Sequence, residues 1–277
     1  MNLSPELYGV HFDLPAADYH ALPGASASQL RTLWQSTPAH LKASLDEPRE
    51  TTAAMMLGTL AHSVILEPDK PLPGIVIQPD EYEPGKKWTN AAKVCKEWRA
   101  AQEQAGLLVL KADEYDAVLG MSSAIADHQI AGPMLENGKP EVSLVTHDTA
   151  NGIPVRARLD FVPDGAPFLA DVKTTQDASA RGFERKAYES GFHIQAALYL
   201  ALWNSLTGET RTGFRFIVCE QKPPYAVNVF DASPEFLSTG NYAFKQTLAT
   251  YARCVHEDSW PAYPPTLQPL SLPKWAN

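Results

Sequence analysis

Two runs of β-forming residues in the middle of the chain, Val155–Pro163 and Phe168–Thr175, are separated by four turn-forming residues, Asp164–Pro167. This pattern predicts a β-hairpin. If the four residues form the loop, the antiparallel ladder places Asp160 directly opposite Asp171. Any fold that this chain adopts therefore has to accommodate two neighbouring carboxylates at one point of its sheet.

The same ladder predicts that four charged side chains share one face of the hairpin. Arg158 falls opposite Lys173, and alternation along the strand sends Asp171 and Lys173 to the same side while Val172 points away. Opposed Cβ atoms lie about 4.5–5.5 Å apart, so two facing carboxylates destabilise the pair unless positive charge lies between them. A divalent cation would supply that charge. The competing interpretation is a solvated hairpin with ordinary cross-strand salt bridges.

The remaining elements are predicted from hydrophobic periodicity and from turn and capping residues. The pattern favours an α/β fold with a central mixed sheet of four or five strands flanked by helices, and a helical N-terminal half. The predicted helices are 28–45, interrupted at Thr37-Pro38, then 53–66, 91–105, 112–128, 183–206 and 234–256. The predicted strands outside the hairpin are 75–77, 141–146, 213–220 and 225–230, and the tail from Trp260 is expected to be extended.

The hairpin and the helix after it resemble the PD-(D/E)xK nuclease superfamily. The shared features are an acid, a short loop, Asp171-Val-Lys173 and then Gln195-Ala-Ala-Leu-Tyr199, whose Gln-x-x-x-Tyr pattern marks recombination and repair exonucleases. Leu159 stands where the literal motif has proline. In the N-terminal half, the segments 26–30, 37–40 and 57–68 resemble exodeoxyribonuclease VIII-type phage-recombination nucleases, and the likeness runs from about Leu22 to Pro264.

This resemblance implies a single nuclease domain over 1–277, with a mainly helical part (1–135), a catalytic α/β core (136–260) and a proline-rich tail (261–277). It implies a catalytic set of Asp160, Asp171, Lys173, Gln195 and Tyr199. It also implies a metal site made by His62, Glu141, Asp160, Asp171 and the Val172 carbonyl. The candidates for contacts with DNA are Arg156, Arg158, Thr174 and Ser28.

Each of these assignments has a structural alternative. A lone histidine beside an apolar helical stripe, as at His62, is more often a core or boundary residue than a ligand. Glu141 could equally be a surface acid at the end of a strand. Gln195 and Tyr199 are four residues apart, so they share a helix face that could simply pack on the sheet.

The activity that the resemblance implies is Mg²⁺-dependent hydrolysis of DNA, with Mn²⁺ able to substitute. The expected enzyme is an exodeoxyribonuclease that degrades linear duplexes from 5′ to 3′ and leaves single strands for an annealing partner. A homo-oligomeric ring is expected around the DNA end. A structure- or sequence-specific endonuclease and a non-catalytic DNA-binding subunit are the alternatives.

Composition restricts these expectations. The net charge of −9 argues against a general electrostatic grip on nucleic acid, which normally uses lysine and arginine footprints. The three scattered cysteines cannot form the four-cysteine cluster that some branches of the superfamily carry. No apolar run approaches the about 18–20 residues needed to span a membrane, and the N-terminus lacks the features of a signal peptide, so a cytoplasmic location is expected.

Overall fold

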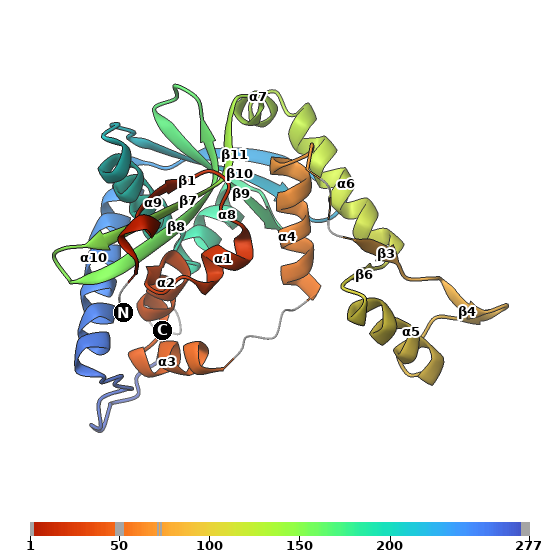
Figure 1. The fold of residues 1–277 in the computed structure, drawn as a ribbon, viewed down its shortest axis with the longest axis horizontal. Helices are drawn as coiled ribbons and strands as arrows, with labels where there is room; N and C mark the ends of the chain where they lie inside the picture. The colour runs from red at the N-terminus through yellow and green to blue at the C-terminus, as the bar shows by residue number, and fades with distance from the viewer. Residues whose placement is uncertain (1–2, 48–52, 71, 73, 273–277) are drawn as a thin grey trace.

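The computed structural model describes residues 3–47, 53–70, 72 and 74–272. Its centre is a seven-stranded mixed sheet in the order β1-β7-β8-β9-β10-β11, with β2 paired to β8 (Figure 1). The β9–β10 and β2–β8 pairs are parallel and the other pairs are antiparallel. The strands are β1 (Gly9–His11), β2 (Ala25–Ser26), β7 (Gly138–Asp148), β8 (Ile153–Pro163), β9 (Phe168–Thr175), β10 (Gly213–Glu220) and β11 (Val227–Asp231).

Helices cover the sheet, and their ends are marked by the residues that the sequence offers for capping. The helices are α1 (Ala16–Ala21), α2 (Ala27–Gln35), α3 (Pro38–Asp46), α4 (Ala53–Leu66), α5 (Lys93–Gln104), α6 (Ala112–Asp127), α7 (Ala131–Glu136), α8 (Ala180–Glu189), α9 (Phe192–Thr207) and α10 (Pro234–Glu257), preceded by a 3₁₀ turn at Pro5–Leu7. At α2, the Ser26 backbone N–H donates to the Gln29 side chain at 2.9 Å, half of a capping box. Thr37 stands at the N-cap of α3 and Pro38 at its first position, which is why the chain breaks there.

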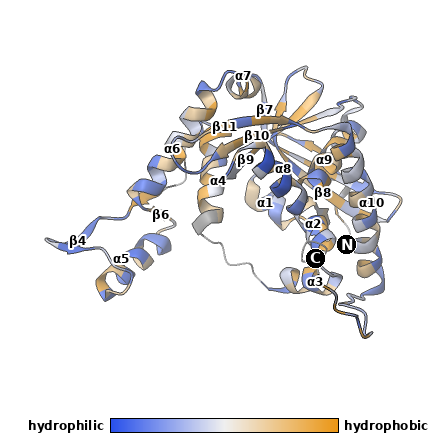
Figure 2. Cartoon of the chain, turned by 180° about the vertical axis from the view of Figure 1, so that it is seen from behind, coloured by the Kyte–Doolittle hydropathy of each residue, from blue (hydrophilic) through white to orange (hydrophobic). Residues whose placement is uncertain are grey.

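Two apolar cores hold the helices to the sheet. The first joins α2, α9 and α10 to β7, β8 and β10, and the second joins α4, α6 and α7 to β9 and β10. The central strands are accordingly hydrophobic, whereas α8 carries a hydrophilic face (Figure 2). The two sets of helices lie at opposite sides of the view in Figure 1, with α10 at the left and α6 at the right.

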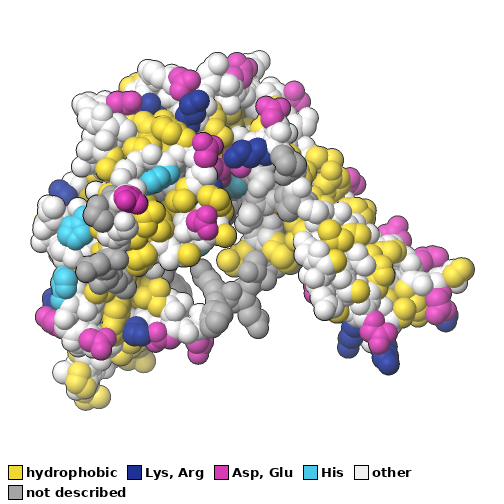
Figure 3. Space-filling model, in the orientation of Figure 1, with side chains coloured by type: hydrophobic (Ala, Val, Ile, Leu, Met, Phe, Trp, Pro, Cys, Tyr) yellow, Lys and Arg dark blue, Asp and Glu magenta, His cyan; other side chains and the backbone are white. Residues whose placement is uncertain are grey.

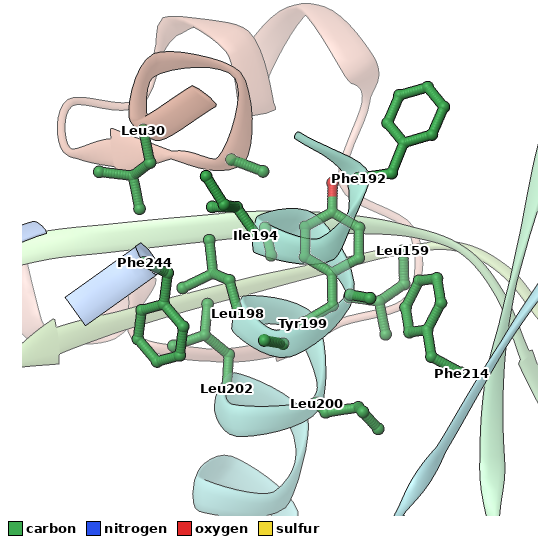
Figure 4. Packing of buried hydrophobic residues seen from close by; sticks show 14 of the residues in the cluster. Leu30, Leu159, Phe192, Ile194, Leu198, Tyr199, Leu200, Leu202, Phe214 and Phe244 are labelled. Carbon is green, nitrogen blue, oxygen red and sulfur yellow. The ribbon is translucent and has the colours of Figure 1, made fainter. Parts of the chain in front are cut away.

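Helix α9 is buried along most of its length and forms the middle of the first core. Ile194, Leu198 and Leu202 pack toward Leu30 of α2 and Phe244 of α10 (Figure 4). The ring of Tyr199 packs in the same cluster, while its hydroxyl oxygen points out of it (Figure 4). A rigid, buried helix therefore presents the Gln195 and Tyr199 side chains.

A small extension, which we call the arm, projects from the body between α4 and α6 (Figures 1 and 2). It consists of residues 74–110, namely β3 (Ile75–Ile77), β4 (Glu81–Glu83), β5 (Lys86–Lys87), α5 and β6 (Leu108–Leu110). β3 pairs with β6 in parallel, and β4 pairs with β5. The rings of Trp88 and Trp98 meet edge to face at 5.1 Å and form the apolar contact inside this extension.

The α/β fold and the mixed sheet predicted from the sequence are confirmed. The bounds of α4, β9 and β10 match the predicted segments, and the hairpin register Phe161–Ala170 is the one that places Asp160 opposite Asp171. None of the described helices is long and apolar enough to cross a membrane.

Three predictions about the elements are wrong. The sheet has seven strands because two short N-terminal segments, β1 and β2, join it. The single helix over 183–206 is two helices, because Gly191 adopts a left-handed conformation (φ 69°) between α8 and α9. Tyr225 also has a positive φ (57°), so β11 begins only at Val227.

The crossing of α10 over α9 leaves no room for a side chain at Gly240. A Cβ atom there would lie 2.0 Å from the His193 carbonyl oxygen, so we expect Gly240→Ala to destabilise the fold by about 1–3 kcal/mol. Gly58, inside α4, is the matched control because a Cβ there would meet nothing within 4 Å. Gly58→Ala should stabilise the protein by about 0.5–1 kcal/mol through helix propensity. Urea unfolding measures both changes, and equal effects of the two substitutions would contradict this packing.

Candidate active site

The sheet forks at Asp160. β7 pairs with one edge of β8 from Ile153 to Pro163, so the other partners of β8 share its opposite edge. On that edge β9 pairs at Phe161, and β2 pairs at Val155 and Arg156. One residue past the β9 pair, the Asp160 carboxylate accepts the Val172 N–H at 2.8 Å. The strands therefore separate at the position that carries the acid, and the side chains of the fork have space to reach a ligand.

Three carboxylates form a row across three neighbouring strands. The pairs Pro140–Phe161 and Val142–Leu159 set the register of β7 against β8, which puts Glu141 opposite Asp160. Glu141 has a positive φ of 52°, a strained conformation for a residue with a side chain. Together with Asp171 on β9, these acids concentrate negative charge at one point of the sheet.

His62 of α4 completes a group with ligand geometry. One donor atom each from His62, Glu141 and Asp160 lies within 4.8 Å of the others, and His62 Nδ1 is 3.7 Å from Asp160 Oδ2. The Val172 peptide lies at the same point, because its N–H donates to the Asp160 carboxylate. The sequence predicted all four of these residues for a metal site, and the structure brings them together.

The fifth predicted ligand, Asp171, lies beneath this group and is fully buried. Gln195 Nε2 donates to Asp171 Oδ1 at 2.6 Å, and Lys173 Nζ forms an ion pair with the other carboxylate oxygen. The Lys173 ammonium also lies 4.9 Å from the centre of the Phe192 ring. These contacts fix both the acid and the lysine, because a buried charge needs partners to offset its loss of hydration.

Burial shifts the pKa of Asp160, His62 and Tyr199 toward the neutral form of each group. Burial raises the pKa of Asp160 well above its ordinary value, and the charge of Asp171 raises it further. Burial lowers the pKa of the His62 imidazole, and the nearby Lys173 ammonium adds to this effect. Burial also raises the pKa of Tyr199 well above its ordinary value. His62 and Tyr199 are therefore neutral near pH 7, and a neutral imidazole is the form that binds metal.

One cavity of about 410 Å³ between α1, α2, α4, α9 and the sheet is lined by His62, Glu141, Asp160, Lys173, Gln195 and Tyr199. Of the residues predicted to contact DNA, Ser28, Arg156 and Arg158 line it as well. Thr174 does not; it lines a different cavity and accepts from the Gln221 side chain at 3.1 Å. Alternation along β9 explains this, because Thr174 points to the opposite face from Lys173.

Both arginines are held by neighbouring groups. Arg158 donates to Glu141 Oε2 at 2.5 Å and to Ser143 Oγ at 2.8 Å. Arg156 is largely buried and donates to the Tyr19 carbonyl oxygen at 2.8 Å, with its guanidinium 4.8 Å from the Tyr19 ring centre. Their charges lie at the wall of the cavity in fixed positions.

Several residues that line this cavity were not predicted from the sequence. Tyr19 sits on a six-residue helix with no motif around it, so nothing in the pattern pointed to it. Glu67, which directly follows α4, could have been found, because Thr59, Ser63 and Glu67 recur every four residues and line the cavity beside His62.

The crowding of like charges predicts the behaviour of Asp160→Asn. The pKa of Asp160 is higher in the folded than in the unfolded protein. Once the pH exceeds the unfolded pKa of about 3.9, this difference lowers the free energy of unfolding, so Asp160 destabilises the metal-free protein at pH 7. Asparagine removes the charge and can still accept the Val172 N–H. We expect an equal or higher melting temperature without metal, and loss of the rise that Mg²⁺ or Mn²⁺ gives the wild type.

The matched control is Asp127→Asn, which changes an exposed carboxylate on α6 that accepts only from Ser123 in the described structure. This variant should respond to metal as the wild type does. A full metal-induced rise in melting temperature for Asp160→Asn would show that the ion binds elsewhere.

Comparison with solved structures supports the same fold. A protein from Eubacterium rectale, described provisionally as an exonuclease, is 12% identical, with a TM-score of 0.61 over 90% of this chain and 88% of that one. A phage-related exonuclease from Haemophilus somnus 129PT is also 12% identical, with a TM-score of 0.35 over 74% of this chain and 100% of that one. The second likeness is too weak to carry an argument. No curated protein matches the chain.

The family comparison covers most of the chain. Residues 26–268 match the model of the PDDEXK-like domain of unknown function, DUF3799. That span contains α2, the His62 helix, the forked hairpin and the Gln195 helix. The chain belongs to this PDDEXK-like family, which confirms its resemblance to the PD-(D/E)xK superfamily.

Proposed function

We propose that this protein is a metal-dependent exonuclease that hydrolyses phosphodiester bonds in linear double-stranded DNA. The observation that carries the proposal is the forked sheet, where His62, Glu141 and Asp160 converge beside the Asp171–Lys173 pair. Carboxylates grouped around an imidazole, with a lysine in the same cavity, are the groups that phosphodiester hydrolysis requires.

The donor set fits a hard divalent ion. Two carboxylates supply oxygen atoms, which Mg²⁺ prefers, and the imidazole makes Mn²⁺ a suitable substitute. His62, Glu141 and Asp160 would hold the ion, with the Val172 backbone beside them and Asp171 within reach of a small rearrangement. When bound, the ion supplies Lewis acidity toward the phosphate and lowers the pKa of an attacking water.

The protein groups around this point orient the reactants. Lys173 lines the cavity and is partly exposed, so its ammonium can donate to a substrate phosphate or to the attacking water. Gln195 fixes the Asp171 carboxylate, which in turn positions Lys173. Tyr199 brings a neutral hydroxyl to the cavity, where it can donate to a phosphate oxygen. Ser28, Arg156 and Arg158 extend the wall with groups that bind phosphate.

The proposal includes degradation in the 5′→3′ direction, a homo-oligomeric ring, delivery of single strands to an annealing partner and a cytoplasmic location. The resemblance to exodeoxyribonuclease VIII-type nucleases supports the direction and the partner. The net charge of −9 supports the ring, because an acidic surface cannot hold DNA tightly through many turnovers. Enclosure keeps the strand in place by geometry instead.

A free DNA end should be required. With Mg²⁺, the purified protein should convert a linear duplex to mononucleotides and leave a closed circle of the same sequence intact. Lys173→Met should slow this digestion by about 10²-fold or more, because it removes a charge that stabilises the transition state. Lys245→Met, at an exposed position of α10, is the matched control and should keep the wild-type rate. Rapid linearisation of the circle would favour an endonuclease.

Ring formation has a separate test. The monomer has a mass of 30.3 kDa, and light scattering should give a small integral multiple of this value at working concentrations. A strictly monomeric protein that digests long duplexes without dissociating would contradict the ring, because another device would then be retaining the DNA.

A further inference from the structure

Helix α4 contributes to two cavities. Thr59, His62, Ser63 and Glu67 line the candidate active site, and Met56 lines a second groove of about 380 Å³. Met56, Thr59 and Ser63 follow at spacings of three and four residues, so they lie on one face of the helix. At a rise of about 1.5 Å per residue, Met56 lies about 9 Å from His62 along the axis.

The second groove, which we call the arm groove, lies where the arm meets α4 and α6. Half of its lining residues are apolar and half are polar or charged: Met56, Leu57, Cys95, Val109 and Leu110, and Asn90, Lys96, Arg99, Lys111 and Glu114. Three cations thus face one carboxylate, in a chain whose net charge is −9. Figure 3 shows an open gap between the body and the arm.

Two of the three cations are available to a ligand. Lys96 and Lys111 are exposed, and neither ammonium forms an ion pair with another described residue. Arg99 is positioned by Gln78, to which it donates at 2.8 Å, and lies 3.6 Å from Glu103. The Glu114 carboxylate accepts the Lys111 backbone N–H at 2.9 Å and is thereby committed to the start of α6. The groove therefore offers converging positive charge without an internal counter-ion for the lysines.

We propose that the arm groove binds the DNA backbone beyond the phosphate at the candidate active site, with one phosphate contact each from Lys96 and Lys111. The proposal rests on the function proposed above. Both sites border α4, with His62 at the candidate active site and Met56 at the arm groove. One strand lying along the exposed face of α4 then contacts both sites.

This second contact has a physical role. The carboxylates of the active site repel DNA, and the chain has few cations to compensate for them. Lys96 and Lys111 place positive charge where the strand continues, so part of the binding free energy comes from counter-ion release at the groove. The arm thereby acts as a clamp for the strand.

The test measures binding without cleavage. In the Asp160→Asn background and in EDTA, fluorescence anisotropy gives the Kd for a 30-base-pair duplex at several salt concentrations. Lys96→Gln combined with Lys111→Gln should raise Kd about tenfold near 0.1 M salt and reduce the slope of log Kd against log salt by about 1.8, or about 0.9 per lost phosphate contact. Lys42→Gln combined with Lys245→Gln removes equal charge from α3 and α10 and is the matched control.

The outcomes separate this inference from the proposed function. Melting curves identify a variant that fails to fold. If the double variant fails, Lys96→Gln alone is measured instead, and half of the slope change is expected. If the groove variant binds DNA like its matched control, the groove does not contact the strand, even if the wild type digests linear DNA. If the groove variant alone loses affinity for DNA and the wild type does not digest linear DNA, the groove binds DNA but the protein is not an exonuclease.

Discussion

The structure depends on holding three carboxylates in a row across adjacent strands. Glu141, Asp160 and Asp171 face one another because the β7-β8-β9 meander fixes their register, and a shift by one residue would send them to the other face. Such crowding opposes folding in the metal-free protein, and burial makes the cost larger. The arrangement is therefore explicable only if something else stabilises it, and the protein offers three means. Lys173 and Gln195 satisfy Asp171, and Arg158 forms an ion pair with Glu141. A divalent ion held with His62 would neutralise Asp160.

The rigid parts of the fold all meet at this point. α9 is buried between the sheet and α10, which fixes Gln195 and Tyr199, and α4 is held by the second core, which fixes His62. The two cores lie on opposite sides of the sheet, so the site is assembled from both. The fork between β9 and β2 leaves the edge of β8 open between them. The open edge of β8 gives a ligand access to Asp160. Burial of apolar side chains in the two cores offsets the backbone hydrogen bonds that β8 does not form there.

Local patterns in the sequence were sufficient for the central elements and for most of the site. β9 follows the turn formers 164–167 and is rich in β-forming residues, and α4 ends at Leu66, two residues before Pro68, so their bounds followed from the residues themselves. Long-range pairing was not predictable. β1 and β2 are only three and two residues long and become strands because β7 and β8 present free edges to them. The helical spacing of apolar residues continues across Gly191, but the positive φ of this residue separates α8 from α9. Alternation along β9 sends the Thr174 side chain to the face opposite Lys173. The predicted DNA contact of Thr174 did not take this alternation into account.

The central claim is that His62, Glu141 and Asp160 form a divalent-metal centre. Crystals soaked in Mn²⁺, with diffraction data collected at the manganese absorption edge, would locate the ion directly. The account predicts an anomalous peak with ligand distances of about 2.0–2.3 Å to the His62 ring and to the Glu141 and Asp160 carboxylates. A cavity without such a peak at saturating Mn²⁺, or a peak bound only by residues outside this group, would contradict it.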